Sequence, residues 1–135
     1  EPMERNPRFP TLRTLLTLDA VTCILMGGLL LAASGPLAGV TQIPAGFLSG
    51  AGMLLLPVAA FMIVVARLRP IPGWAAYMVV LGNVLWVVAS VALPASGVLE
   101  PNLAGWICLL AQALVVALLA VLEFEAAQRS GRALA

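Results

Sequence analysis

The residues of this sequence with the greatest potential for chemistry are a few polar side chains inside long apolar stretches. Asp19 stands out because it is the one ionisable residue within four such stretches. A carboxylate at the centre of a membrane-spanning helix costs about 2.5–3.5 kcal/mol on insertion scales. Such a group is normally paired, hydrated from inside a helix bundle, protonated or used in a function. Asp19 is therefore the first candidate for a binding or ion-coupling residue.

The other candidate residues are polar side chains at helical spacing in the same stretches. Thr22 lies three residues after Asp19, and Asn83 is followed by Trp86 and Ser90 at steps of three and four residues. Residues three or four apart share one face of a helix, and amide side chains in membrane helices hydrogen-bond to neighbouring helices. The predicted substrate- or ion-binding residues are Asp19, Thr22, Asn83, Trp86, Ser90 and Gln112.

Three of these side chains are predicted to lie at similar depths. Asp19 is roughly 9 Å along its helix from Arg13, at 1.5 Å per residue. If the fourth helix ends at Leu122, Asn83 and Gln112 each lie roughly 15 Å from the same side. Side chains or one water can span the difference of roughly 6 Å. The spacing thus predicts a polar cluster of Asp19, Asn83 and Gln112.

Two interpretations of this cluster stay open. It is either a hydrogen-bonded staple that fixes the register of the helices, as a buried Asn does in coiled coils, or a protonatable site for an ion or polar substrate. The predicted helices contain no arginine that could pair with Asp19, and this favours the interpretation as a protonatable site.

Several chemistries lack the residues they need. The chain contains no His and no Lys, so we expect no metal centre, no haem of the usual ligation and no Schiff base. No phosphate-binding loop or hydrolase motif occurs, and we expect no cofactor and no nucleic-acid partner. The two cysteines, Cys23 and Cys108, lie in apolar surroundings and are predicted to act as small hydrophobic residues rather than as a disulfide.

The elements that must position these residues are membrane helices. The sequence is 62% hydrophobic and 10% charged, with a mean hydropathy of +1.08, which a soluble domain could not accommodate without large exposed apolar patches. Helices of about 20 residues are long enough to span a hydrocarbon core of about 30 Å. We expect a single domain over residues 1–135, all-α, with transmembrane helices at about 14–33, 47–66, 74–93 and 103–122.

The arginines predict one orientation of these helices. The chain's seven arginines precede the first helix, lie between the second and third, or follow the fourth: Arg5, Arg8, Arg13, Arg67, Arg69, Arg129 and Arg132. The connections at 34–46 and 94–102 contain none. Arginine-rich short loops stay cytoplasmic, so we predict an up-down-up-down four-helix bundle with both termini inside.

Helix packing is predicted to involve the second helix. Gly46 and Gly50 are four residues apart, a spacing that permits close helix approach either within the bundle or in a dimer. Pro57 removes a backbone donor and is expected to kink this helix near its middle.

The charged residues at the cytoplasmic rim are predicted to contact lipid and one another. Arg67, Arg69, Arg129 and Arg132 are candidate anchors for anionic lipid headgroups. Glu123 and Glu125 follow the fourth apolar stretch and are expected to pair with Arg67, Arg69 or Arg13 at the surface.

Short segments around the polar residues resemble a known group. The stretches Leu18-Asp19-Ala20-Val21, Leu56-Pro57-Val58 and Asn83-Val84-Leu85-Trp86-Val87-Val88-Ala89-Ser90 are similar to an uncharacterised family of small bacterial four-helix integral membrane proteins. The resemblance implies a four-helix fold in the bacterial inner membrane and brings no established activity. It also places Asp19, Asn83, Trp86 and Ser90 in the family's recognisable segments.

Three functions are compatible with these features. The first is a non-enzymatic accessory or scaffold protein with a polar cluster around Asp19, because no complete active site is evident. The second is an oligomeric small transporter that uses Asp19 as an ion- or proton-coupling carboxylate. The third is a lipid- or quinone-binding protein with Trp86 and Asn83 beside the Pro57 kink. The expected partners are the lipid bilayer and either a second copy of the chain or another membrane protein.

Overall fold

The computed structural model of this chain describes residues 11–134, with side chains over residues 11–131. Arg5, Arg8 and the side chain of Arg132 lie outside this description. The described residues form five helices and no strand: α1 (Leu12–Ala32), α2 (Ser34–Thr41), α3 (Ala45–Arg67), α4 (Gly73–Ala95) and α5 (Leu103–Leu134). Four of them, α1, α3, α4 and α5, are long and apolar enough to cross a membrane. The predicted all-α architecture with four long apolar helices is confirmed.

Helices α2 and α5 differ from the sequence-based expectation. The predicted loop at 34–46 contains α2, because Pro36 falls in the first helical turn, where a missing N–H costs nothing. Helix α5 continues past the predicted end at Leu122 as far as Leu134. Residues 123–129 contain no Gly or Pro and are rich in strong helix formers, so the helix outlasts its apolar stretch.

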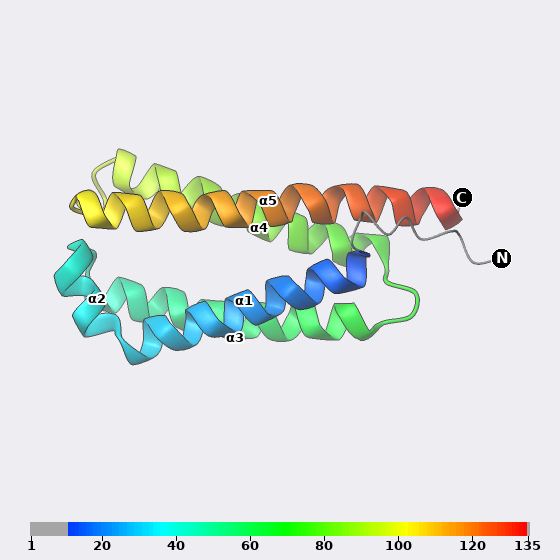
Figure 1. The fold of residues 1–135 in the computed structure, drawn as a ribbon, viewed down its shortest axis with the longest axis horizontal. Helices are drawn as coiled ribbons and strands as arrows, with labels where there is room; N and C mark the ends of the chain where they lie inside the picture. The colour runs from blue at the N-terminus through cyan, green and yellow to red at the C-terminus, as the bar shows by residue number, and fades with distance from the viewer. Residues whose placement is uncertain (1–10, 135) are drawn as a thin grey trace.

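The long helices associate as two pairs. Helix α1 packs chiefly against α3 and forms the first pair, and α4 packs chiefly against α5 and forms the second pair (Figure 1). Between the pairs, the contacts are mainly those of α1 and α2 with α5, whereas α3 and α4 scarcely touch although only residues 68–72 join them. Sequence neighbours are therefore not always packing neighbours in this bundle.

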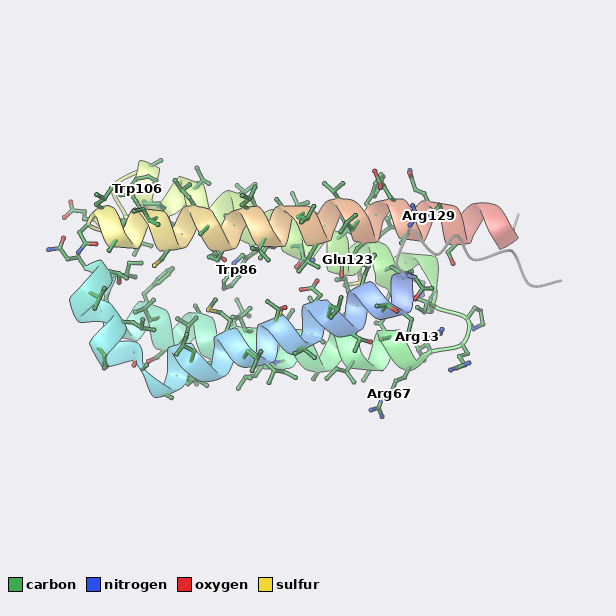
Figure 2. All side chains as sticks on the ribbon, viewed as in Figure 1. Arg13, Arg67, Trp86, Trp106, Glu123 and Arg129 are labelled. Atoms are coloured by element: carbon green, nitrogen blue, oxygen red, sulfur yellow. The ribbon has the colours of Figure 1, made fainter. Side chains whose placement is uncertain are left out.

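One end of the molecule collects the described arginines. The first residues of α1, the connection from α3 to α4 and the last residues of α5 all lie at this end (Figure 1). Figure 2 shows Arg13, Arg67 and Arg129 there as well. We call it the arginine-rich end.

Two glycines lie where the two helices of the first pair approach each other closely. A Cβ atom on Gly27 would lie 3.1 Å from the carbonyl oxygen of Gly52, and one on Gly52 would lie 2.8 Å from the carbonyl oxygen of Gly27. By contrast, a Cβ on Gly46 or Gly50, the predicted packing residues, would meet nothing within 4 Å. Within this chain the close contact is thus made by Gly52, which lies on another face of α3.

Helix α3 continues without interruption through Pro57. The proline side chain is exposed on the outside of the first pair. A proline on this face removes a backbone donor without disturbing the core of the pair.

The end opposite the arginines is closed by α2 and the start of α5. The backbone N–H of Asn102 donates to the carbonyl of Thr41 at 3.0 Å, and its side-chain amide donates to the carbonyl of Val40 at 2.7 Å. The Asn102 carboxamide oxygen also accepts from the N–H of Gly105 at 2.8 Å, as a helix N-cap does. A Cβ on Gly105 would lie 2.5 Å from the Thr41 oxygen, so only glycine permits this approach.

Candidate functional site: a buried carboxyl–amide cluster

A cluster of three polar side chains joins the two helix pairs. Asn83 on α4 donates through Nδ2 to Oδ2 of Asp19 on α1 at 2.8 Å and to Oε1 of Glu123 on α5 at 2.7 Å. The three residues are 6%, 2% and 0% exposed respectively. One amide nitrogen therefore links three helices through two carboxyl groups in the interior. We call Asp19, Asn83 and Glu123 the carboxyl–amide cluster.

The position of Glu123 corrects the expectation that it pairs with arginine at the rim. Figure 2 shows Glu123 on the side of α5 that faces α1. Its neighbours on this face include the buried residues Ala120 and Ala127, three and four residues away along α5. The small alanine side chains let the neighbouring helices approach this face of α5, and the larger Glu123 side chain is completely buried there.

A signal for this placement exists in the sequence. Ala113, Ala120 and Ala127 recur every seven residues and are all buried, and Glu123 shares their face. Glu123 was expected at the rim because the apolar stretch ends at Leu122. The buried face of the helix, however, continues beyond Leu122 and includes Glu123.

The cluster contains two carboxyl groups and no cation. The guanidinium of Arg13, the arginine nearest to Asp19 in sequence, donates instead to the carbonyls of Ala66 and Leu68 at 2.6 and 2.7 Å. Among the described residues, Arg13, Arg67 and Arg69 form no ion pair with Asp19 or Glu123. Two carboxylates that share a buried site repel each other strongly, and unpaired buried charges are strongly destabilising. The pair is therefore expected to retain a proton.

One atom of the cluster has no partner. Oε2 of Glu123 is buried and accepts or donates no hydrogen bond. The thiol of Cys23 makes a weak contact with the other side of the cluster, from its Sγ to Oδ1 of Asp19 at 3.8 Å. An unsatisfied buried polar atom costs about 1–3 kcal/mol, so this oxygen is a place where a proton or a small polar group would be favoured.

Gln112 belongs to a different cluster from the one predicted. Its Oε1 accepts from the indole N–H of Trp86 at 2.7 Å, and its Nε2 donates to Oγ of Ser90 at 2.8 Å. These three residues, which we call the indole–amide cluster, join α4 to α5 within the second pair. The depth estimate for Gln112 took Leu122 as the helix end. Because α5 continues to Leu134, Gln112 lies farther from the arginine-rich end than Asn83 does.

The remaining predicted residue, Thr22, stands apart from both clusters. Its side chain is exposed and its hydroxyl donates to the carbonyl of Leu18 within α1 at 2.9 Å. The predicted set therefore divides into Asp19 with Asn83, then Trp86 with Ser90 and Gln112, and Thr22 alone. The indole N–H of Trp86 is already engaged and is not free for an added carbonyl.

The described side chains contain no group of three or more His, Cys, Asp or Glu residues that could hold a metal ion. Cys23 is buried and Cys108 is exposed, and both are free thiols. The chemistry open to the site is that of carboxyl, amide and proton.

Comparison of the chain with protein-family models, with curated proteins and with solved structures returned no match in any of the three.

Proposed function

We propose that this chain is a small multi-pass protein of the bacterial inner membrane and serves as a non-enzymatic accessory or scaffold protein. In this proposal the carboxyl–amide cluster is the staple that holds the two helix pairs together in lipid. The observation that carries it is the single amide of Asn83, which bonds carboxyl groups on two other helices.

The surface of the bundle supports the membrane setting. Large apolar side chains cover the outside of the long helices, for example Leu25 at 69% and Leu114 at 72% exposed. Exposed apolar area of this extent is stable only against lipid or another apolar surface.

The proposed orientation is up-down-up-down with both termini cytoplasmic. The arginine-rich end carries every described arginine, whereas the connections at the other end carry none. Positively charged short loops remain on the cytoplasmic side. The resemblance to small bacterial four-helix proteins through the segments around Asp19 and Asn83 supports the bacterial inner membrane as the proposed location.

The staple is needed because the two pairs have few other contacts across the bilayer. Apolar burial does not drive helices together in lipid, so hydrogen bonds of about 0.6–2 kcal/mol each carry more of the association there. The cluster supplies one such bond between the pairs near the arginine-rich end, from Asn83 to Asp19, while the bond from Asn83 to Glu123 fixes the donor within the second pair. Asn102 supplies its own bond between the pairs at the opposite end.

The test removes the bridging amide and follows the separation of the pairs. In a variant without Cys23 and Cys108, spin labels on exposed positions of α1 and α5, such as Val21 and Leu114, report the distance between pairs in nanodiscs. We expect Asn83→Leu to broaden or lengthen this distance distribution.

Gln112→Leu is the matched control, because it removes an amide whose bonds stay within the second pair. We expect it to leave the α1–α5 distance nearly unchanged. An unchanged distance in Asn83→Leu would contradict the staple.

A second candidate function is favoured by the unpartnered Oε2 of Glu123. A buried carboxyl pair that retains a proton has the chemistry of a proton-coupled site, as in an oligomeric small transporter that uses Asp19 together with Glu123. Four helices enclose little space alone, so this function requires a second copy of the chain.

Proteoliposomes with an internal pH-sensitive dye test the transporter. A proton flux that Asp19→Asn and Glu123→Gln both abolish, while both variants keep the thermal stability of the wild type, would favour transport over the staple. Equal flux in wild type and variants would exclude an essential carboxyl.

A further inference from the structure

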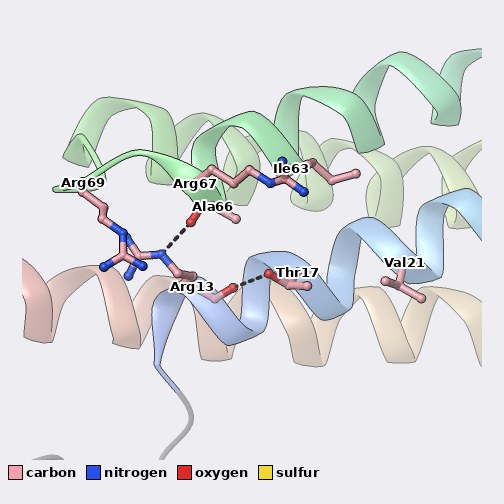
Figure 3. A pocket seen from close by; sticks show the side chains of 7 residues that line it. All are labelled: Arg13, Thr17, Val21, Ile63, Ala66, Arg67 and Arg69. Atoms are coloured by element: carbon pink, nitrogen blue, oxygen red, sulfur yellow. Dashed lines mark hydrogen bonds between the residues drawn. The ribbon is translucent and has the colours of Figure 1, made fainter.

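A second polar feature lies outside the carboxyl–amide cluster. An open groove of about 430 Å³ runs between α1 and α3 at the arginine-rich end (Figure 3). The residues that matter for its chemistry are Arg13, Thr17 and Val21 on α1, Ile63 and Arg67 on α3, and Arg69 just after α3.

Arg13 is held in place by the end of α3. Its Nε and Nη2 donate to the carbonyls of Ala66 and Leu68 at 2.6 and 2.7 Å. Ala66 lies in the last turn of α3 and Leu68 is the residue that caps it, and a cation is favoured at this end of a helix by the helix dipole. A guanidinium has five N–H donors, so the remaining ones stay available while the group is fixed in position.

The groove has three cations and no carboxylate. Arg67 and Arg69 line it together with Arg13, and no acidic side chain contributes to its wall. None of the three forms an ion pair with a carboxylate among the described residues. The guanidinium groups of Arg13 and Arg69 lie close together, and that of Arg67 lies apart from them beside Ile63 (Figure 3). Positive charges without a counter-charge attract an anion, and arginine matches the geometry of a phosphate group.

The character of the groove changes along α1. Arg13, Thr17 and Val21 are four residues apart, so they lie on one face at steps of about 6 Å. Thr17 donates its hydroxyl to the carbonyl of Arg13 at 2.8 Å. Beyond it, Val21 and Ile63 make the wall apolar, and Val21 is 47% exposed. The order is cation, hydroxyl, then hydrocarbon.

We propose that this groove binds one anionic glycerophospholipid, with its phosphate against Arg13, Arg67 and Arg69 and an acyl chain along Val21 and Ile63. A phospholipid shows the same order of charge, ester and hydrocarbon over a similar depth of the bilayer. The proposal rests on the membrane setting of the proposed function but not on the staple role of the carboxyl–amide cluster.

Native mass spectrometry of the full chain from detergent micelles tests this directly. The protein is titrated with phosphatidylglycerol or phosphatidylcholine that carry identical acyl chains. We expect preferential retention of one phosphatidylglycerol. The double variant Arg67→Gln/Arg69→Gln should weaken that retention about 30-fold, because each arginine near a membrane surface contributes about fivefold.

The matched control is Arg129→Gln, which removes a charge at the same end from a residue that does not line the groove. We expect it to weaken retention less than Arg67→Gln alone. Equal losses in these two single variants would show that the arginines act only as diffuse surface charge and would overturn the proposal. Retention by the double variant equal to that of the wild type would overturn it as well.

Two further experiments distinguish a bound lipid from bound free phosphate. Val21→Phe fills the exposed apolar part of the groove without a change of charge, and it should weaken phosphatidylglycerol retention. Inorganic phosphate should compete only weakly with the lipid. If Val21→Phe has no effect and phosphate displaces the lipid fully, the groove takes a free anion and the lipid proposal is wrong.

The result of the lipid-binding test can be distinguished from the result of the test of the proposed function. The groove variants do not contact the carboxyl–amide cluster, so a failed lipid test with a normal α1–α5 distance would leave the staple standing. Flotation of the protein with liposomes shows independently whether the chain is embedded in the membrane at all.

Discussion

Replacement of Glu123 tests whether its carboxyl is neutral or shares a proton with Asp19. Glu123→Gln keeps an oxygen that can accept from the Asn83 amide, fills nearly the same volume and carries no charge. If the buried carboxyl pair retains a proton, glutamine mimics the protonated side chain. We therefore expect a change in the free energy of unfolding within about 1 kcal/mol, the size of one ordinary hydrogen bond.

Glu123→Ala should behave very differently. It removes the 2.7 Å hydrogen bond from Asn83, at about 0.6–1.7 kcal/mol in a membrane protein. It also leaves a void where a completely buried side chain stood, which adds about 1–2 kcal/mol at roughly 24 cal/mol per Å³. Together these terms predict a loss of about 2–4 kcal/mol.

Glu125 offers a matched pair of controls two residues further along the same helix. Its side chain is exposed, so Glu125→Gln and Glu125→Ala should each stay within about 0.5 kcal/mol of the wild type. The assay is equilibrium unfolding in mixed micelles, followed by tryptophan fluorescence, for all four variants. If Glu123→Gln destabilises the protein as much as Glu123→Ala does, the charge of Glu123 is required and the shared-proton reasoning is refuted.

Two further predictions follow from the packing of the helices. Gly52→Ala should destabilise the fold by about 1–3 kcal/mol, because the added Cβ would lie 2.8 Å from the Gly27 carbonyl oxygen, a backbone atom that cannot easily move. Gly50→Ala is the control in the same unfolding assay. Its added Cβ would meet nothing within 4 Å, so this variant should be neutral or slightly stabilising. A changed oligomeric state in Gly50→Ala would instead place that glycine in a dimer contact. A membrane-permeant maleimide should label the exposed Cys108 faster than the buried Cys23, as read by peptide mass spectrometry, and equal rates would contradict the burial of Cys23 on α1.

The amino-acid sequence by itself determined the local features of the protein. Hydropathy and length are properties of contiguous segments, so four long apolar helices could be predicted, and the structure confirms them. Depth along a helix follows from a constant rise per residue. For this reason counting from Arg13 and from the start of α4 correctly brought Asp19 and Asn83 within reach of each other.

The tertiary structure decided which faces of the helices meet. Glu123 joined the cluster because α5 outlasts its apolar stretch and turns this buried face, which carries Ala120 and Ala127, toward the interior. The same extra length moved Gln112 away from Asp19 and toward Trp86. The close approach fell on Gly52 rather than on Gly46 or Gly50 because helix rotation depends on the partner helix. A one-dimensional pattern records spacing along each helix, whereas the relative rotation and offset of two helices are set only when their side chains pack together.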